Sequence, residues 1–238
     1  LVSKMVKPGK NEKPGRYVLK YISTGLQDTG QMNILNAKNE ISKMAVVTED
    51  MFSTFLDVFT HPDVKMGIEV DKVKRMEELT DQMQEEISRY LVECSNEELS
   101  EKSIRNVNAL LRIVNELENV GDSCFKLIIL TQKKYNRKLQ LHERAQEEIK
   151  DFAKLVTEFM AFYKANLNEA LDNKGLDIAF KMENKINHSR DNLKRAARKR
   201  LQEGADVNAE LLYLDILKNF EHIGDNALNI AQALRNIS

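Results

Sequence analysis

The last of the three prolines in the chain is Pro62, and no proline interrupts the long remainder of the sequence. Because proline removes a backbone donor and clashes with the preceding helical turn, its absence permits long helices over most of the chain. From Gln27 onward, apolar residues recur at three- and four-residue spacing, the period of an amphipathic helix. Short β-branched runs such as Val46-Val47-Thr48 lie inside this helical pattern, so they do not indicate strands. The sequence therefore predicts an all-α protein.

Five polar clusters divide the helical pattern into six segments. The clusters lie at His61-Pro62-Asp63, Cys94-Ser95-Asn96, Asn136-Arg137-Lys138, Asn173-Lys174-Gly175 and Gly204-Ala205-Asp206. Six helices of about 25 to 38 residues would each be roughly 40 to 55 Å long at 1.5 Å per residue, a length typical of helical bundles. Residues 1–23 carry spaced basic residues and two prolines, so we predict a basic linker there with little core.

Composition excludes several classes of protein. Of the 238 residues, 42% are hydrophobic and 31% are charged, and no stretch reaches the roughly 20 apolar residues that a membrane span needs. The formal net charge of -1 provides no overall attraction to nucleic acid, and neither it nor the apolar content fits an unfolded chain. Cys94 and Cys124 lie far apart without zinc-type spacing, which fits a reducing compartment better than a disulfide framework.

One segment of the sequence occurs twice. Leu111–Asp122 (LRIVNELENVGD) aligns without a gap on Leu214–Asp225 (LDILKNFEHIGD), and both contain Glu-x-(Val/Ile)-Gly-Asp. The glycines of the two copies, Gly121 and Gly224, lie in mid-helix, where we expect them to permit close approach of another backbone. The copies are separated by about half the chain, which indicates a duplicated unit rather than a short-period solenoid. We therefore expect two tandem antiparallel three-helix bundles, at residues 24–136 and 137–238.

The acids of this motif occupy positions that a bundle normally fills with apolar side chains. Glu118 lies seven residues from both Leu111 and Phe125, and Glu221 lies seven residues from both Leu214 and Leu228. Each glutamate therefore falls within an apolar stripe and is predicted to face the bundle. Asp122 and Asp225 follow four residues later, on nearly the same helix face. Two like charges in a bundle interior would cost several kcal/mol unless a cation or hydrogen-bond partner offsets them. A bound cation would remove this conflict; in the alternative, the acids face water or pair with Lys and Arg.

The middle helix of each unit carries a second pair of polar residues at the same spacing. Glu77 and Asp81 form it in the first unit, and Glu183 and Asn187 in the second. Two helices presenting such pairs could jointly supply four carboxylates, the oxygen ligands that Mg²⁺, Mn²⁺, Ca²⁺ or iron accepts. For these middle-helix residues alone, a solvated face is the favoured interpretation. A purely structural bundle with paired acids is the alternative to a metal site.

Sequence motifs of two enzyme classes are absent. None of the four histidines is preceded by glutamate at three residues, so the Glu-x-x-His ligands of di-iron carboxylate enzymes are missing. The glycine-rich phosphate loop of nucleotide enzymes is missing too. We therefore expect a protein without enzymatic activity. The basic run from Arg190 to Arg200 is interpreted mainly as a solvated helix face.

At Glu118–Asp122 and Glu221–Asp225, the sequence resembles PhoU, the bacterial phosphate-uptake regulator family, whose duplicated three-helix bundles carry Glu-Arg-Ile-Gly-Asp on each third helix. The resemblance extends over most of the chain. It implies that carboxylates of the second and third helices bind divalent or iron-type metal ions, here at Glu77, Asp81, Glu118, Asp122, Glu183, Glu221 and Asp225. The chain departs from the family pattern at Asn119 and His222, which replace the signature arginine, and at Asn187, which lacks the charge of a matching acid.

The first part of the chain resembles one branch of this family. Arg16–Ile22 (RYVLKYI), Asn36–Met44 (NAKNEISKM) and Met51-Phe52 are similar to the start of the PhoU-like cytosolic domain of bacterial sodium/phosphate cotransporters. The chain also begins at Leu1 rather than at methionine. In such proteins a basic linker, here 1–23, lies next to the anionic membrane surface, although a solvated charged tail is the alternative.

This second resemblance implies a specific function. The chain would be a regulatory PhoU-like domain that controls sodium-dependent phosphate uptake on the cytoplasmic side of the bacterial inner membrane. Its partner would be a transmembrane phosphate transporter, in the same chain or separate, and a second copy of the chain in a homodimer is a further candidate. The alternative is a free-standing PhoU regulator of a phosphate ABC permease and its sensor kinase.

Overall fold

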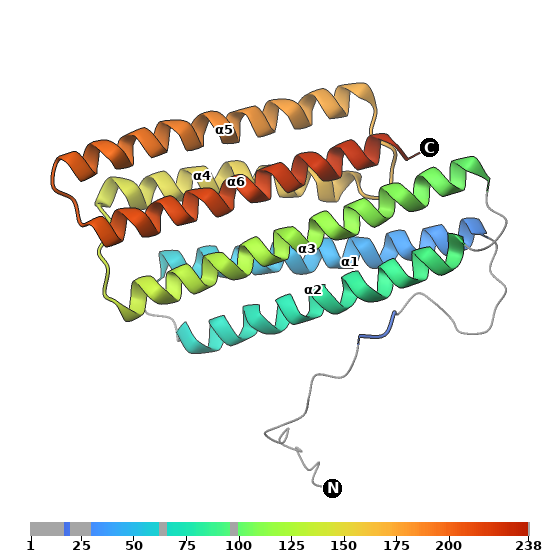
Figure 1. Cartoon of the computed structure of the whole chain (residues 1–238), viewed down its shortest axis with the longest axis horizontal. Coiled ribbons are helices and arrows are strands. Elements are labelled where there is room, and N and C mark those ends of the chain that lie inside the picture. Colours follow the sequence, from blue (N-terminus) through green and yellow to red (C-terminus); the bar gives the residue numbers. More distant parts are fainter. Residues whose placement is uncertain (1–16, 20–29, 62–65, 96–99, 238) are drawn as a thin grey trace, which may run out of the picture.

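The computed structural model describes residues 17–19, 30–61, 66–95 and 100–237, and the regular secondary structure of these residues is entirely helical (Figure 1). Successive helices run antiparallel to one another. The described residues form α1 (Gly30–Thr60), α2 (Met66–Ser95), α3 (Glu101–Asn136), α4 (Glu143–Asn166), α5 (Asn173–Gln202) and α6 (Val207–Arg235). The all-α fold class that the periodicity predicts is thus confirmed.

Side-chain caps explain where several helices begin. Ser100 accepts a hydrogen bond from the Ser103 amide at the start of α3, and Asp206 accepts one from the Ala209 amide at the start of α6. The predicted break at Asn173-Lys174-Gly175 is wrong, because these residues form the first turn of α5. Asp172 caps that turn by accepting from the Gly175 amide, and the true connection is residues 167–172.

The helices fall into two sets of three that share one core. Within each set all three helices contact one another, and the sets meet where α3 packs on α6 and α1 packs on α4. Helices α2 and α5 lie on opposite outer sides of the molecule (Figure 1). The buried apolar residues of both sets form one continuous cluster. This arrangement has two three-helix units, while the boundaries at 24–136 and 137–238 stay a prediction.

Aromatic side chains join the two sets at the centre of the core. The Phe220 ring of α6 has its centroid 5.6 Å from that of Phe52 and 5.8 Å from that of Phe55, both on α1. Phe152 of α4 lies 5.3 Å from Phe220, also in an edge-on arrangement. Such geometry is the preferred packing of aromatic rings. Phe220 therefore connects three helices across the boundary between the sets.

The basic run of α5 was predicted to be a solvated helix face, and this prediction is wrong for one residue in particular. Arg198 and Lys199 are exposed as expected, but Arg200 is buried. Arg200 Nε donates to Glu210 Oε1 of α6 at 2.8 Å, and its Nη1 donates to Glu148 Oε2 of α4 at 2.9 Å. Its guanidinium also lies 4.7 Å from the centre of the Tyr213 ring. Arg200 is buried because these partners compensate its charge.

The predicted basic linker is described only at residues 17–19, and the rest of 1–23 lies outside the described residues. The Tyr17 amide donates to Gln82 Oε1 of α2 at 2.8 Å, and the Tyr17 hydroxyl donates to the buried Glu40 of α1 at 2.6 Å. Tyr17 and Leu19 pack against the core. None of the helices in the described part of the chain has the length and apolarity needed to cross a membrane.

Candidate functional site

The two copies of the repeated motif meet where α3 packs on α6. Residues of both helices line an open polar hollow of about 310 Å³, with Asp122 contributed by α3 and Asp225 by α6. Asn119 and His222, which stand where the resembling family has arginine, line the same hollow. The packing of the two units thus brings both aspartates to one place, which the sequence pattern of each unit alone does not reveal.

The motif glycines allow the middle helices to approach closely. A Cβ atom built on Gly121 would lie 3.0 Å from Thr80 Oγ1, and one on Gly224 would lie 3.0 Å from Ile186 Cδ1. The sequence predicted close approach of another backbone, but a β-branched side chain of the middle helix fills the space at each glycine. Since Thr80 and Ile186 occupy equivalent places, Glu77 corresponds to Glu183 in the other unit.

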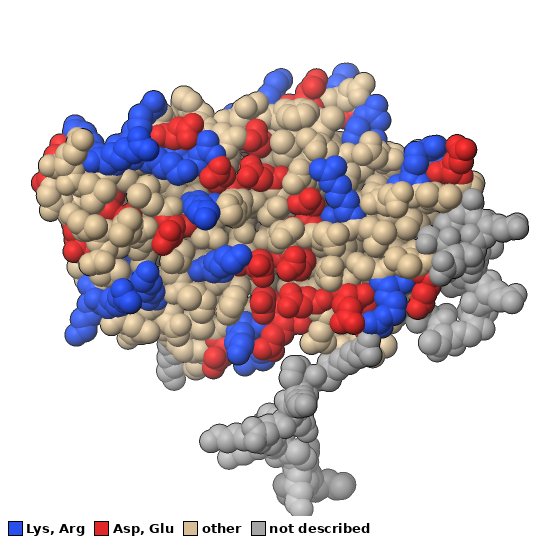
Figure 2. All heavy atoms as spheres, in the orientation of Figure 1, with Lys and Arg blue, Asp and Glu red and all other residues tan. Residues whose placement is uncertain are grey.

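The acids of the first unit lie close to one another on the neighbouring helices α2 and α3. Figure 2 shows acidic side chains gathered over the middle of these two helices, whereas basic side chains gather toward the end of α5 and at the end of α3. Partial burial, followed by the negative charges of Asp81 and Asp122, raises the pKa of Glu77. Partial burial, followed by Asp122 and Asp81, also raises the pKa of Glu118. Carboxylates from both helices therefore lie close enough to repel one another.

Burial of these acids is less complete than the apolar stripe predicts. Glu118 is only partly buried, while its neighbours Leu117 and Val120 are fully buried. The buried face of α3 is therefore centred one position away from the series of residues at seven-residue spacing that contains Glu118. Glu221 is likewise partly buried, with 20% of its side chain exposed. The prediction that both glutamates face the bundle interior is wrong; they lie at its edge.

The described cations that act on Glu77 and Glu118 are Lys74 and Lys126, and burial and the neighbouring carboxylates outweigh both. Lys126 Nζ lies 3.2 Å from Asp122 Oδ2, and Lys74 lies 3.9 Å from Glu78. Desolvation, followed by Asp122 and Glu78, raises the pKa of Asp81. The surplus of carboxylate oxygens suits a cation in charge and in chemical type. Within the described ranges, however, no group of three or more His, Cys, Asp or Glu side chains is gathered as metal ligands.

The second unit supplies its own cations. Arg190 of α5 donates to Glu221 of α6, and Lys194 Nζ lies 3.9 Å from Glu221 Oε2. Asn187 donates to Glu183, while its own buried Oδ1 has no hydrogen-bond partner among the described residues. Desolvation raises the pKa of Asp225, and the nearby His222 and Arg190 lower it in part. In this unit Arg190 and Lys194 compensate Glu221, which makes that carboxylate a poorer metal ligand than Glu118.

One substitution between the units contributes to this difference. In the register set by Thr80 and Ile186, Gln84 of α2 occupies the place of Arg190 of α5. Gln84 Nε2 donates to Asn115 Oδ1 at 2.9 Å and brings no charge to the acids. Sequence reasoning missed Arg190 as a partner of Glu221. The available signal was its position seven residues beyond Glu183, on the same face of the helix.

Comparison with known proteins identifies the fold. Residues 41–128 match the PhoU domain. The structure is similar to that of PhoU from Pseudomonas aeruginosa, with a TM-score of 0.78 and 16% identity over 87% of this chain and 97% of that one. It is also similar to the phosphate transport system regulatory protein PhoU from Streptococcus pneumoniae, with a TM-score of 0.73 and 16% identity over 87% of this chain and 95% of that one. No curated protein matches the sequence. The first unit thus carries a match to the PhoU domain, and the chain as a whole has the fold of the PhoU structures.

Proposed function

We propose that this protein is a non-enzymatic regulator of phosphate uptake. The observation that carries the proposal is the pair of Glu-x-(Val/Ile)-Gly-Asp motifs, which meet at the interface between α3 and α6 within a PhoU fold. The PhoU domain matched by residues 41–128 contains the first of these motifs. A surface that combines both units is suited to report a change in either unit to a partner protein.

The free-standing form of this regulator is favoured over the cotransporter domain. The structures that the chain resembles are PhoU proteins, one of them named as a regulatory protein of a phosphate transport system. In this form the protein acts on the cytoplasmic side of the membrane, on a phosphate permease and its sensor kinase. A PhoU-like domain of a sodium-dependent phosphate cotransporter is the second form, supported by the similarity of Arg16–Ile22 and Asn36–Met44 to such domains.

Gene deletion in the native cell tests the regulatory function. We expect that phosphate uptake in the deletion strain no longer responds to external phosphate, and that the wild-type gene restores the response. Uptake that keeps its normal response would contradict the proposal.

Fractionation with an antibody distinguishes the two forms. A band near 27.4 kDa outside the membrane fraction is expected for the free-standing regulator, and a much heavier membrane-integral band for the cotransporter.

We extend this proposal to a metal ion at the first unit. Carboxylates of α2 and α3 repel one another there with little compensating charge, which favours cation binding. Movement of side chains around Glu77 and Glu118 would have to complete the ligand set, because the described conformation does not gather three ligands. The second unit is expected to bind no metal, because Arg190 pairs with Glu221.

A charge transplanted from the second unit to the first tests the metal proposal. Gln84→Arg should place a guanidinium beside Glu118, as Arg190 lies beside Glu221, and weaken binding of Mn²⁺ or Zn²⁺ at least tenfold. Gln202→Arg adds the same charge on an exposed position of α5 and should leave binding unchanged. Calorimetric titration and metal analysis of the purified protein measure both variants. Equal metal affinity of Gln84→Arg and the wild type would refute a site at these acids.

A further inference from the structure

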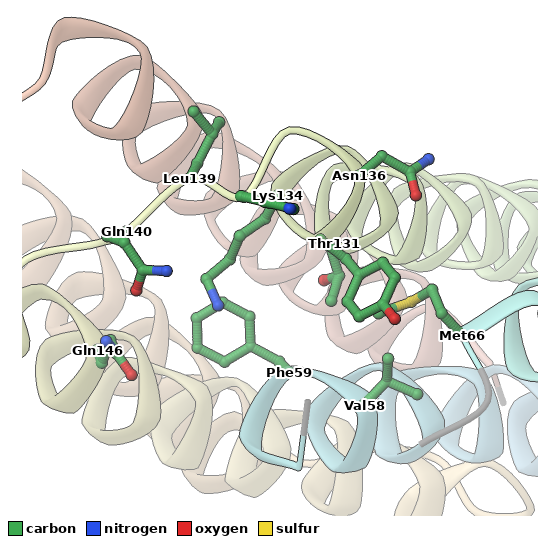
Figure 3. A pocket seen from close by; sticks show the side chains of 11 residues that line it. Val58, Phe59, Met66, Thr131, Lys134, Asn136, Leu139, Gln140 and Gln146 are labelled. Carbon is green, nitrogen blue, oxygen red and sulfur yellow. The ribbon is translucent and has the colours of Figure 1, made fainter. Parts of the chain in front are cut away.

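A cavity unrelated to the repeated motif lies at one end of the molecule. It has a volume of about 600 Å³, within the range of roughly 300 to 1,000 Å³ typical of small-molecule sites. The end of α1, the start of α2, the end of α3, the connection to α4 and the first turn of α4 line it. Figure 3 shows Val58, Phe59 and Met66 on one side, with the amides of Gln140 and Gln146 on another. The cavity therefore offers both an apolar wall and hydrogen-bonding groups.

The side chain of Lys134 extends into this cavity. It leaves the last turn of α3 and reaches toward α1, where its Nζ lies 5.4 Å from the centre of the Phe59 ring (Figure 3). Lys134 is half-buried, and no described residue accepts a hydrogen bond from its Nζ or forms an ion pair with it. Contact with the ring face is a weak compensation for a partly desolvated ammonium. The ammonium thus retains hydrogen-bonding capacity for a ligand.

The charge of the described lining is purely positive. Lys138 also lines the cavity, and the described lining contains neither aspartate nor glutamate. A left-handed backbone conformation at Lys138, with φ of 52°, turns the chain from α3 into the connection that borders the cavity. Partial burial lowers the pKa of Lys134, because the surroundings do not replace the water lost by its charged form. An anion in the cavity would supply the missing counter-charge.

We propose that this cavity binds a small organic anion, with its acidic group at Lys134 and an apolar body against Phe59 and Met66. Val58, Phe59 and Met66 are nearly covered, and the exposed Tyr135 ring and the half-buried Leu139 supply the accessible apolar lining. That surface favours an organic anion over inorganic phosphate, which would leave it in contact with water. The amides of Gln140 and Gln146 provide donors and acceptors for polar groups of the ligand. The inference goes beyond the proposed regulation of uptake and involves none of the acids of the repeated motif.

A charged and an uncharged probe with the same ring test the proposal. Calorimetric titration of the full chain with 2-naphthoate should show one site, at least tenfold tighter than for 2-naphthalenemethanol. Lys134→Met should abolish this preference for the charged probe. Lys133→Met removes the same charge from the neighbouring exposed position, outside the cavity lining, and should keep the preference. Octanoate serves as an aliphatic anion in the same titrations.

The place where 2-naphthoate binds is measured on the wild type, so that the result does not depend on the folding of the variants. In a protein labelled at its methionine methyl groups, 2-naphthoate should shift the resonance of Met66. It should leave that of Met182 unchanged, since α5 contacts only α4 and α6. Three results would overturn the proposal: no saturable binding of either anion, an unmoved Met66 resonance, or a charge preference that survives in Lys134→Met.

Discussion

At the scale of single residues, the two units differ in the charged side chains that surround the same motif. Glu221 is paired with Arg190, whereas Glu118 faces Asp81 and Asp122 with Gln84 at the place of the arginine. Like charges one turn apart destabilise a helix by a few tenths of a kcal/mol, and more where water is partly excluded. The first unit therefore retains at Glu118 an electrostatic cost that Arg190 relieves at Glu221 of the second unit. Such an unrelieved cost is a common feature of functional sites.

The pH dependence of stability should reveal this cost. The pKa values of Glu77 and Glu118 are raised in the folded protein, so the folded state binds their protons more tightly than the unfolded chain does. This proton binding stabilises the fold fully below the ordinary glutamate pKa. The stabilisation is lost as the pH rises through the raised pKa values. Glu77→Gln with Glu118→Gln should therefore raise the metal-free free energy of unfolding at pH 7, by about 0.5 kcal/mol. The gain should shrink as pH falls toward 4.

Urea denaturation at several pH values in the presence of a chelator measures this gain. The matched control is Glu93→Gln with Glu158→Gln, which removes two exposed glutamates from α2 and α4. That control should not reproduce the pH dependence of the site variant. A site variant less stable than the wild type at pH 7 would show that these carboxylates are stabilising, contrary to the expectation.

At the scale of elements, buried charge fixes how the last turn of α5 packs. Arg200 bonds to Glu210 of α6 and to Glu148 of α4, and the Tyr213 hydroxyl donates to the same Glu148 oxygen at 2.7 Å. The side chain of Glu210 is only 1% exposed, so it depends on Arg200 for its counter-charge. Removal of one partner from a buried ion pair leaves an uncompensated charge in the interior.

Arg200→Met should accordingly lower the free energy of unfolding by about 3 to 5 kcal/mol. Arg198→Met removes an exposed arginine from the same turn and should change it by no more than about 0.5 kcal/mol. The double variant Arg200→Met with Glu210→Met should recover part of the loss, since no unpaired Glu210 carboxylate is left inside. Thermal and urea denaturation compare the three variants with the wild type. A loss below about 1 kcal/mol for Arg200→Met would contradict a stabilising role of this pair.

Helix existence was predictable from periodicity, whereas the details depended on contacts between helices. The Asn173-Lys174-Gly175 cluster looks like a helix break, yet the side chain of Asp172 turns it into a helix start. The register of Glu118 was misplaced by one position, because a seven-residue stripe does not distinguish the centre of a buried face from its edge. The pairing of Arg190 with Glu221 requires the relative position of α5 and α6, which no pattern within one helix contains.

At the scale of the whole molecule, duplication places equivalent elements next to each other. Helices α3 and α6 carry the two motif copies and pack directly against one another, so the duplicated sites share one interface. The sequence repeat predicted two similar units. That Asp122 and Asp225 line a common hollow follows only from the packing of the units, in which the third helix of each lies inside and α2 and α5 lie outside.

A shared core implies that the two units unfold together, and Phe220 is the residue that tests this coupling. Its ring contacts those of Phe52, Phe55 and Phe152 and is fully buried. Phe220→Ala should lower the free energy of unfolding by about 3 to 5 kcal/mol, because it leaves a cavity among helices of both units.

Amide hydrogen exchange should then show protection falling in α2 as well as in α5, although neither outer helix contacts the other. Phe180→Ala provides the matched control, since Phe180 lies on α5 with 40% of its surface exposed. It should change stability by about 0.5 kcal/mol or less. If Phe220→Ala weakened protection only in α4, α5 and α6, the units would unfold independently, and a change in one could not be passed to the other through the core. Loss of protection in both outer helices would instead make the continuous core the physical connection between the two copies of the motif.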